Sequence, residues 1–105
     1  MVYIVYQEDR PDGAAAIRKA KLDEHLAYLE QHKDILVLGG ALLAEDASQR
    51  LGSVALINAA SRAAVDAFVA NEPFRRAGLF KSIKVSRMRK GQWHPDNAPK
   101  TPEGN

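Results

Sequence analysis

"ILVLGGALL", residues 35–43, is the stretch that decides the fold, because apolar side chains occupy both of its alternating faces. Residues 2–7, "VYIVYQ", show the same feature. β-branched, aliphatic and aromatic runs of this length predict strands. A sheet covered by helices on one side only carries polar residues on its other side, so a second apolar layer must cover these strands. In so short a chain we expect that layer to be a second copy, giving a homodimer packed sheet to sheet.

The remaining patterns complete an alternating order of strands and helices. We expect strands over residues 2–7, 35–43, 53–58 and 80–88, and helices over residues 14–32 and 62–71. Ser61 is a good N-cap for the second helix. The helices are expected to bury Ile17, Leu22, Leu26 and Leu29 in the first, and Ala64, Val65, Phe68 and Val69 in the second. The order β-α-β-β-α-β predicts a ferredoxin-like α+β domain: an antiparallel sheet with both helices on one face.

Composition narrows the functional classes. The chain has 105 residues, no cysteine and a net charge of +2, which is too small to indicate nucleic-acid binding. The basic residues within 81–90 are interpreted as a solvated strand face. No apolar run approaches the roughly 18 residues of a membrane span. We therefore expect a cytoplasmic protein that binds neither nucleic acid nor membrane. Residues 1–92 are expected to form one domain, and residues 93–105, rich in Pro, Asn and Gly, a flexible tail.

His25 is the histidine of interest. On the first predicted helix it lies at the edge of the apolar stripe, and Arg18, two turns earlier, falls on nearly the same line. A half-buried imidazole suits proton transfer near neutral pH. The alternative is a histidine at the edge of the core that only hydrogen-bonds a backbone carbonyl. His32 is seven residues away, whereas helical metal-binding pairs use spacings of three or four, so no metal site is expected.

Glu72, in the stretch "NEPFRRAGLF" of residues 71–80, is a possible partner for His25. Pro73 suits the first position of a helix, which makes Glu72 its N-cap. Glutamate is not a preferred cap, however, and Asn71 would serve better. Capping therefore does not fully explain this carboxylate. It is either a cap alone or one half of an acid-base pair.

Two glycines and two aromatic residues complete the candidate site. Gly39 and Gly40 interrupt an apolar strand, which indicates either a bulge or room for a small ligand above the sheet. Tyr28 and Phe74 are interpreted as core or pocket wall. No phosphate-binding glycine loop and no nucleophile elbow is present. We expect no cofactor.

Three segments together resemble the YCII-related (YciI-like) family: "EHLAYLEQHKD" at 24–34, "LVLGGAL" at 36–42 and "NEPFRRAGLF" at 71–80. The resemblance implies a dimeric α+β barrel, and it implies that His25 and Glu72 take the active-site roles of the family. The family usually has aspartate where this chain has Glu72, so the carboxylate reaches one methylene further. A YciI-like protein acts as a dehydrochlorinase on a chlorinated hydroxyquinol, and the wider superfamily includes muconolactone isomerase and small monooxygenases.

Two hypotheses for the function follow. The first is a cofactor-independent lyase, isomerase or dehydrochlorinase. In it, His25 is the acid-base group, Glu72 orients it, and a small oxygenated substrate is bound by Arg18, Tyr28, Gly39, Gly40 and Phe74. The second is a non-catalytic dimeric module that binds a small ligand or a protein through the same cleft. Nucleic-acid binding through residues 81–90 is the weakest alternative.

Overall fold

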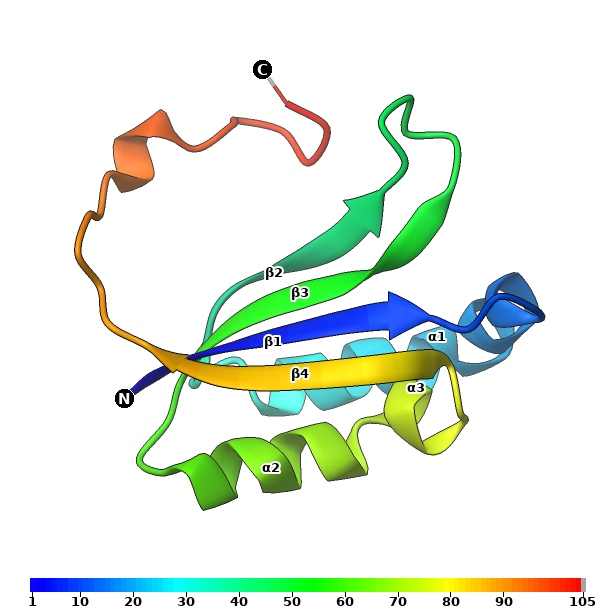
Figure 1. Ribbon diagram of the computed structural model, residues 1–105, viewed down its shortest axis with the longest axis horizontal. Helices are drawn as coiled ribbons and strands as arrows, with labels where there is room; N and C mark the ends of the chain where they lie inside the picture. Colours follow the sequence, from blue (N-terminus) through cyan, green and yellow to red (C-terminus); the bar gives the residue numbers. More distant parts are fainter. Residues whose placement is uncertain (105) are drawn as a thin grey trace.

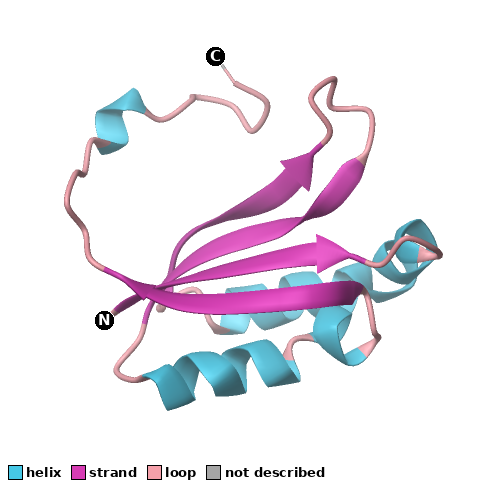
Figure 2. Ribbon diagram, in the orientation of Figure 1, coloured by secondary structure: helices cyan, strands magenta, loops and turns pink. Residues whose placement is uncertain are grey.

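The computed structural model describes residues 1–104 (Figures 1 and 2). Its elements, in chain order, are β1 (Val2–Asp9), α1 (Ala14–Gln31), β2 (Leu36–Leu43), β3 (Arg50–Asn58), α2 (Arg62–Asn71), α3 (Pro73–Arg76), β4 (Phe80–Met88) and the 3₁₀ helix η1 (Pro95–Asn97). The four strands form one sheet in the order β2-β3-β1-β4, with every neighbouring pair antiparallel. All three α-helices lie on one side of it (Figure 1). The predicted ferredoxin-like arrangement, the fold of the dimeric α+β barrels, is confirmed.

The core lies between the sheet and α2. Its buried side chains are Tyr3, Val5, Ile57, Ala59, Val65 and Phe68. Alternate residues of β1 point to this core, as period-two alternation requires, and their partners in β3 face the same side. Ser61 begins α2 as predicted: its side chain accepts a hydrogen bond of 3.1 Å from the backbone nitrogen of Ala64.

Gly52 allows β1 and β3 to approach closely near one end of the sheet. A Cβ at this position would lie 2.0 Å from the backbone oxygen of Gln7, a distance that no side chain tolerates. Beside it, Gln7 Nε2 donates to Ser53 Oγ at 2.7 Å. The close approach at Gly52 thus brings Gln7 and Ser53 together, and both residues line a cavity of the protein.

Several local expectations were wrong. Leu22 and Leu26 of α1 are 42% and 53% exposed, and Ala64 is exposed as well. The predicted α1 stripe is therefore only partly packed: Leu29 packs against the core, whereas Leu22 and Leu26 do not. The short helix α3 begins at Pro73 with Glu72 as its N-cap, as predicted, and only its length was not given by the sequence patterns. β1 and β3 also extend beyond their predicted bounds.

The sheet face away from the helices is apolar and uncovered. Val2, Ile4 and Tyr6 alternate with the core residues of β1 and so point to this face. Their register neighbours on the same face include Leu38, Val54, Leu56 and Met88. Tyr6 is 44% and Leu38 is 61% exposed. The observation behind the predicted dimer, an apolar second face, is therefore present in the folded chain.

The segment after β4 leaves the sheet near the start of β1 and arches over the side that faces away from the helices (Figure 1). It contains η1 and one isolated bridge between Thr101 and Gly104. The predicted flexibility of residues 93–105 stays a prediction, and residue 105 lies outside the described residues. Within residues 1–104, no helix combines the length and the apolar character that crossing a membrane requires.

Candidate functional site

His25 and Glu72 are in direct contact. His25 Nδ1 lies 2.5 Å from Glu72 Oε1, although 47 residues separate the two in the chain. The Glu72 side chain is 8% exposed and that of His25 is 22% exposed. An enclosed carboxylate requires a partner, because burial removes the water that would solvate its charge. Here the imidazole is that partner.

Glu72 also caps α3. Its second carboxylate oxygen, Oε2, accepts a hydrogen bond of 3.0 Å from the backbone nitrogen of Arg75. α2 ends at Asn71 and Pro73 begins α3, so Glu72 lies in extended conformation between two helices. The two sequence interpretations of this residue are therefore compatible. Oε2 accepts the hydrogen bond that caps α3, and Oε1 contacts His25 Nδ1.

The contact orients the imidazole ring. An ionised carboxylate can only accept hydrogen bonds, so His25 Nδ1 carries the hydrogen when it bonds to Glu72. In the neutral ring, Nε2 then keeps its lone pair. Phe74 fixes the ring plane from another direction: its ring stacks on the imidazole with a centroid distance of 3.9 Å and an interplanar angle of 14°. The arrangement leaves one nitrogen with basic character outside the pair.

A cavity of about 410 Å³ opens beside this pair. Leu22, Leu26 and Leu29 of α1 form one part of its apolar lining, and residues of the strands and of α2, among them Val5, Phe68 and Val69, form another. Its polar lining consists of Gln7, Arg18, His25, Arg50, Ser53 and Glu72. The exposed leucines of α1 are thus accounted for, because Leu22 and Leu26 line the cavity and do not pack in the core. A space of this size fits a small ring compound.

Gly39 and Gly40 both line the cavity. The strand register is continuous through them, and its irregularities fall on either side, between Leu36 and Leu38 and between Leu42 and Leu43. A Cβ would meet nothing within 4 Å at Gly40 and only an ordinary contact of 3.8 Å at Gly39. Of the two alternatives, a bulge at the glycines is therefore excluded. Gly39 pairs with Ala55 on the helix side of the sheet, so its missing side chain leaves space in the cavity. Gly40 pairs with Val54 on the opposite face, so it contributes its backbone alone to the lining.

Tyr28 occupies a different environment from the other predicted binding residues. Its hydroxyl donates to the backbone oxygen of Phe68 at 2.7 Å, and it is not among the residues that line the cavity. Burial raises the pKa of the Tyr28 hydroxyl above its ordinary value, and the negative charge of Glu72 raises it further. The geometry gives no support to a direct substrate contact by Tyr28.

Arg18 lines the cavity and is held by a residue that the sequence patterns did not single out. Its guanidinium makes two hydrogen bonds to Asp9, and its central carbon lies 5.4 Å from the centre of the Phe74 ring. The cavity residue Arg50 was also missed. The only signal for Asp9 was an acidic residue closing a strand ahead of a helix whose first half carries Arg18, Lys19 and Lys21, a pattern too common to be specific.

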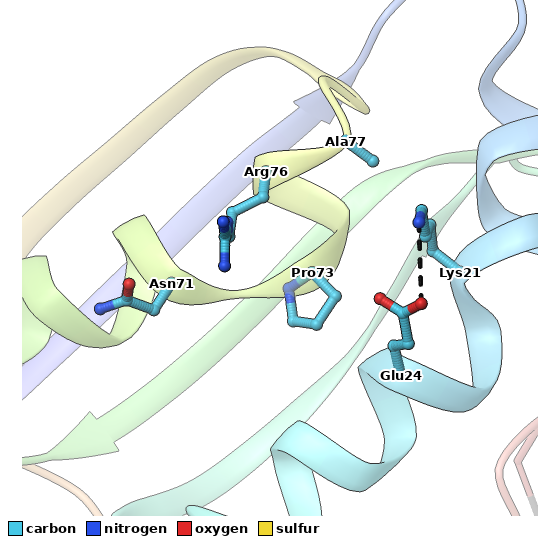
Figure 3. Close-up of a pocket in the computed structure, with 6 residues that line it drawn as sticks. All are labelled: Lys21, Glu24, Asn71, Pro73, Arg76 and Ala77. Carbon is cyan, nitrogen blue, oxygen red and sulfur yellow. Dashed lines mark ion pairs between the residues drawn. The ribbon is translucent and has the colours of Figure 1, made fainter.

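A second hollow of about 370 Å³ lies on the outer side of α1 and α3 (Figure 3). It is lined by Lys21, Glu24, Asn71, Pro73, Arg76 and Ala77. Lys21 and Glu24 form an ion pair of 3.6 Å there. Neither His25 nor Glu72 reaches this hollow, so we place the candidate site in the larger cavity. Among residues 1–104 there is no cluster of three or more His, Cys, Asp or Glu side chains suited to a metal ion.

Comparison with solved structures gives one informative likeness. The chain is similar to 5-chloro-2-hydroxyhydroquinone dehydrochlorinase from Burkholderia phenoliruptrix AC1100, a structure in complex with 2,5-dihydroxybenzoquinone. The sequence identity is 36%, the TM-score is 0.77, and the match covers 87% of this chain and 96% of that one.

Two further likenesses are weaker. An antibiotic biosynthesis monooxygenase is 16% identical, with a TM-score of 0.49 and coverage of 85% of this chain and 97% of that one. Rv0793 from Mycobacterium tuberculosis is 15% identical, with a TM-score of 0.47 and coverage of 87% and 97%. These values are too low to assign an activity. No curated protein sequence matches the chain. The model of the YCII-related domain matches residues 1–89, and the protein belongs to that family.

Proposed function

We propose that this protein is a small acid-base enzyme that uses no cofactor and acts on an oxygenated ring, with His25 as the proton-transfer group. The observation that carries the proposal is the 2.5 Å contact between His25 Nδ1 and Glu72 Oε1 at the wall of a 410 Å³ cavity. A histidine held by a carboxylate at the wall of a cavity, within reach of a bound ligand, is a typical arrangement for general acid-base catalysis. The 36% identity to a dehydrochlorinase adds support.

In this proposal Glu72 is the orienting partner. It holds the hydrogen on Nδ1, so that Nε2 is the atom that accepts a proton from the substrate. When His25 becomes an imidazolium, the adjacent carboxylate stabilises the new positive charge, because the pair is largely shielded from water. General acid-base catalysis of this kind contributes about 10²- to 10⁴-fold to a rate.

The reaction class that we propose is elimination of HCl from a chlorinated trihydroxybenzene. His25 Nε2 accepts a hydroxyl proton, the electron pair moves into the ring, and the imidazolium returns a proton to the carbon that bears chlorine. Loss of a second hydroxyl proton then expels chloride with the bonding pair of the C–Cl bond. The products are a hydroxyquinone and HCl. No external oxidant is needed, because the departing chloride takes the two electrons that the ring gives up.

The test uses 5-chloro-2-hydroxyhydroquinone under anaerobic conditions, where the ring does not oxidise on its own. Chloride release and quinone absorbance are measured together. We expect turnover by the wild type and a loss of at least about 100-fold in kcat for His25→Ala. Glu72→Gln should retain the cap of α3 while removing the charge that supports the imidazolium, so its kcat should fall by a smaller factor.

His94→Ala is the matched control. His94 lies beyond β4, where it bonds Gln92, and it lines neither cavity. Its removal should leave kcat unchanged. If His25→Ala turns over as fast as the wild type, the acid-base role is refuted. If the wild type binds the ring compound and never releases chloride, the alternative of a non-catalytic binding module is favoured.

We also propose that the protein forms a homodimer through the uncovered sheet face. An apolar face of this extent, with Leu38 61% exposed, is what a second sheet would bury. Sedimentation equilibrium should give twice the mass of one chain. Leu38→Lys should shift the equilibrium to the monomer, whereas Ala63→Lys, on the exposed side of α2, should not. A wild-type protein that sediments as a monomer contradicts this proposal.

A further inference from the structure

Asp9 and Arg18 form an ion pair that is nearly closed off from water. The Asp9 side chain is 6% exposed and that of Arg18 is 13% exposed. Arg18 Nε donates to Asp9 Oδ2 at 3.1 Å, and Arg18 Nη2 donates to Asp9 Oδ1 at 2.8 Å. Two parallel hydrogen bonds fix the plane of a guanidinium as well as its position. Arg18 is therefore held in one orientation by Asp9.

The position of Asp9 depends on an irregularity of the sheet. It is the last residue of β1, and the register between β1 and β4 shifts between Glu8 and Asp9. The turn that follows leads into α1 through Gly13, which has a left-handed backbone. Arg18 then lies in the second turn of that helix. The carboxylate is thus anchored by the sheet and the guanidinium by the helix, so the pair joins two separate elements at the cavity wall.

The orientation leaves part of the guanidinium for a ligand. Within residues 1–104 the hydrogen bonds of Arg18 use Nε and Nη2, and Nη1 has none. Every buried polar side-chain atom of residues 1–104 has a hydrogen-bond partner. Because Nη1 has no partner, it is not buried and is accessible to solvent. Arg18 lines the cavity that holds His25. The two residues are seven positions apart on α1, or about 10 Å along the helix axis.

The charge balance indicates which group Arg18 binds. Asp9 offsets the positive charge of Arg18, so the pair offers N–H donors with little net charge. A donor of this kind favours an oxygen with a partial negative charge that grows during the reaction. It does not favour an anion that carries several full charges. The stacked Phe74 ring near both Arg18 and His25 supplies an aromatic wall for a planar compound.

We propose that Asp9 is a positioning residue, which holds Arg18 so that Nη1 donates a hydrogen bond to a carbonyl or phenolic oxygen of the ring whose proton His25 removes. This inference rests on the proposed function and adds to it the substrate group and the residue that aligns its donor. Asp9 itself touches no substrate. Its effect passes entirely through Arg18.

The experiment measures binding of 2,5-dihydroxybenzoquinone by calorimetry, which does not require turnover. The variants are Asp9→Asn, Arg18→Lys and the double variant. Arg18→Lys keeps a positive charge for Asp9 but loses the planar fork, and we expect it to raise the Kd about tenfold or more. Asp9→Asn should raise the Kd by a similar factor in the wild-type background and by almost none in the Arg18→Lys background, because its effect passes through Arg18.

Asp66→Asn is the matched control, since Asp66 pairs with Arg62 on α2, where both side chains are more than half exposed. It should leave the Kd unchanged. Circular dichroism checks that each variant is folded. If Asp9→Asn fails to fold, Arg18→Lys alone tests the donor, and an unchanged Kd overturns the inference.

Equal effects of Asp9→Asn in both backgrounds would also overturn the inference, as would the absence of saturable binding to the wild type. Failure of the proposed function would look different. In that case the Kd pattern would hold, while His25→Ala would bind normally and the wild type would release no chloride.

Discussion

α1 and α2 lie on the same side of the sheet and differ in what they bury. α2 has ten residues and buries Val65 and Phe68 in the core. α1 has eighteen residues and buries none of them. The longer helix instead supplies Arg18, Leu22, His25, Leu26 and Leu29 to the cavity. α2 therefore supplies the buried helical side chains of the core, whereas α1 mainly lines the cavity and only its Tyr28 and Leu29 pack against the core.

This difference between α1 and α2 explains how so small a domain can contain an open cavity. Apolar side chains that face a cavity add little stability, because they remain partly exposed to water. The core between α2, β1 and β3 must supply that stability instead. Glu72 joins the two regions, since it follows α2 directly and contacts α1 through His25. The predictions below test this division of roles, in order of decreasing effect on the free energy of unfolding.

Phe68→Ala should cause the largest loss. Phe68 is 8% exposed and packs in the core on α2. Removing an aromatic side chain from such a position lowers the free energy of unfolding by about 3 to 5 kcal/mol. Urea unfolding at one fixed protein concentration measures it. A loss below about 1 kcal/mol would mean that α2 does not anchor the fold as we describe.

Glu72→Ala should have an intermediate effect, because it removes two interactions at once. The cap of α3 is lost, and His25 Nδ1 is left without its partner. Ser61→Ala is the matched comparison, since Ser61 caps α2 and contacts no histidine. A lost cap costs about 1 kcal/mol, and the unpaired histidine should add about as much again. Equal losses for the two variants would show that the contact with His25 contributes nothing to stability.

Leu26→Ala should cost less than about 1 kcal/mol, because Leu26 is 53% exposed. Its effect should appear in binding, since the side chain belongs to the apolar wall of the cavity. We expect a weaker affinity for 2,5-dihydroxybenzoquinone with nearly unchanged urea unfolding. A large loss of stability would mean that α1 packs on the sheet in solution, closing the cavity.

The smallest effect is expected at high pH. Burial and the charge of Glu72 raise the pKa of Tyr28 in the folded protein above its unfolded value of 10.0. Above pH 10 the unfolded chain therefore loses this proton first, and the free energy of unfolding falls as pH rises. Tyr28→Phe removes this contribution. The stability difference between wild type and Tyr28→Phe should narrow above pH 10, and a difference that stays constant would refute the shift.

Most elements could be predicted from sequence because their signals are local. Ser61 capped a helix where expected, and alternation on β1 separated the core-facing Tyr3 and Val5 from the residues of the open face. The start of α3 at Pro73 was also predicted, but its length was not, since its four residues carry no periodicity. The buried stripe of α1 was wrong at Leu22 and Leu26, because an apolar pattern does not distinguish a packed surface from a cavity wall.

The order of strands and helices and the apolar second face of the sheet follow from the amino-acid sequence alone. The sequence also shows which residue types are suited to acid-base chemistry. Those properties follow from the spacing of side chains along the chain. Only the tertiary structure decided that His25 Nδ1 meets Glu72 Oε1 across 47 residues, and that Asp9 holds Arg18 at the cavity. Contacts of that kind depend on how elements pack against one another, and no local pattern encodes the distance between two side chains on different elements.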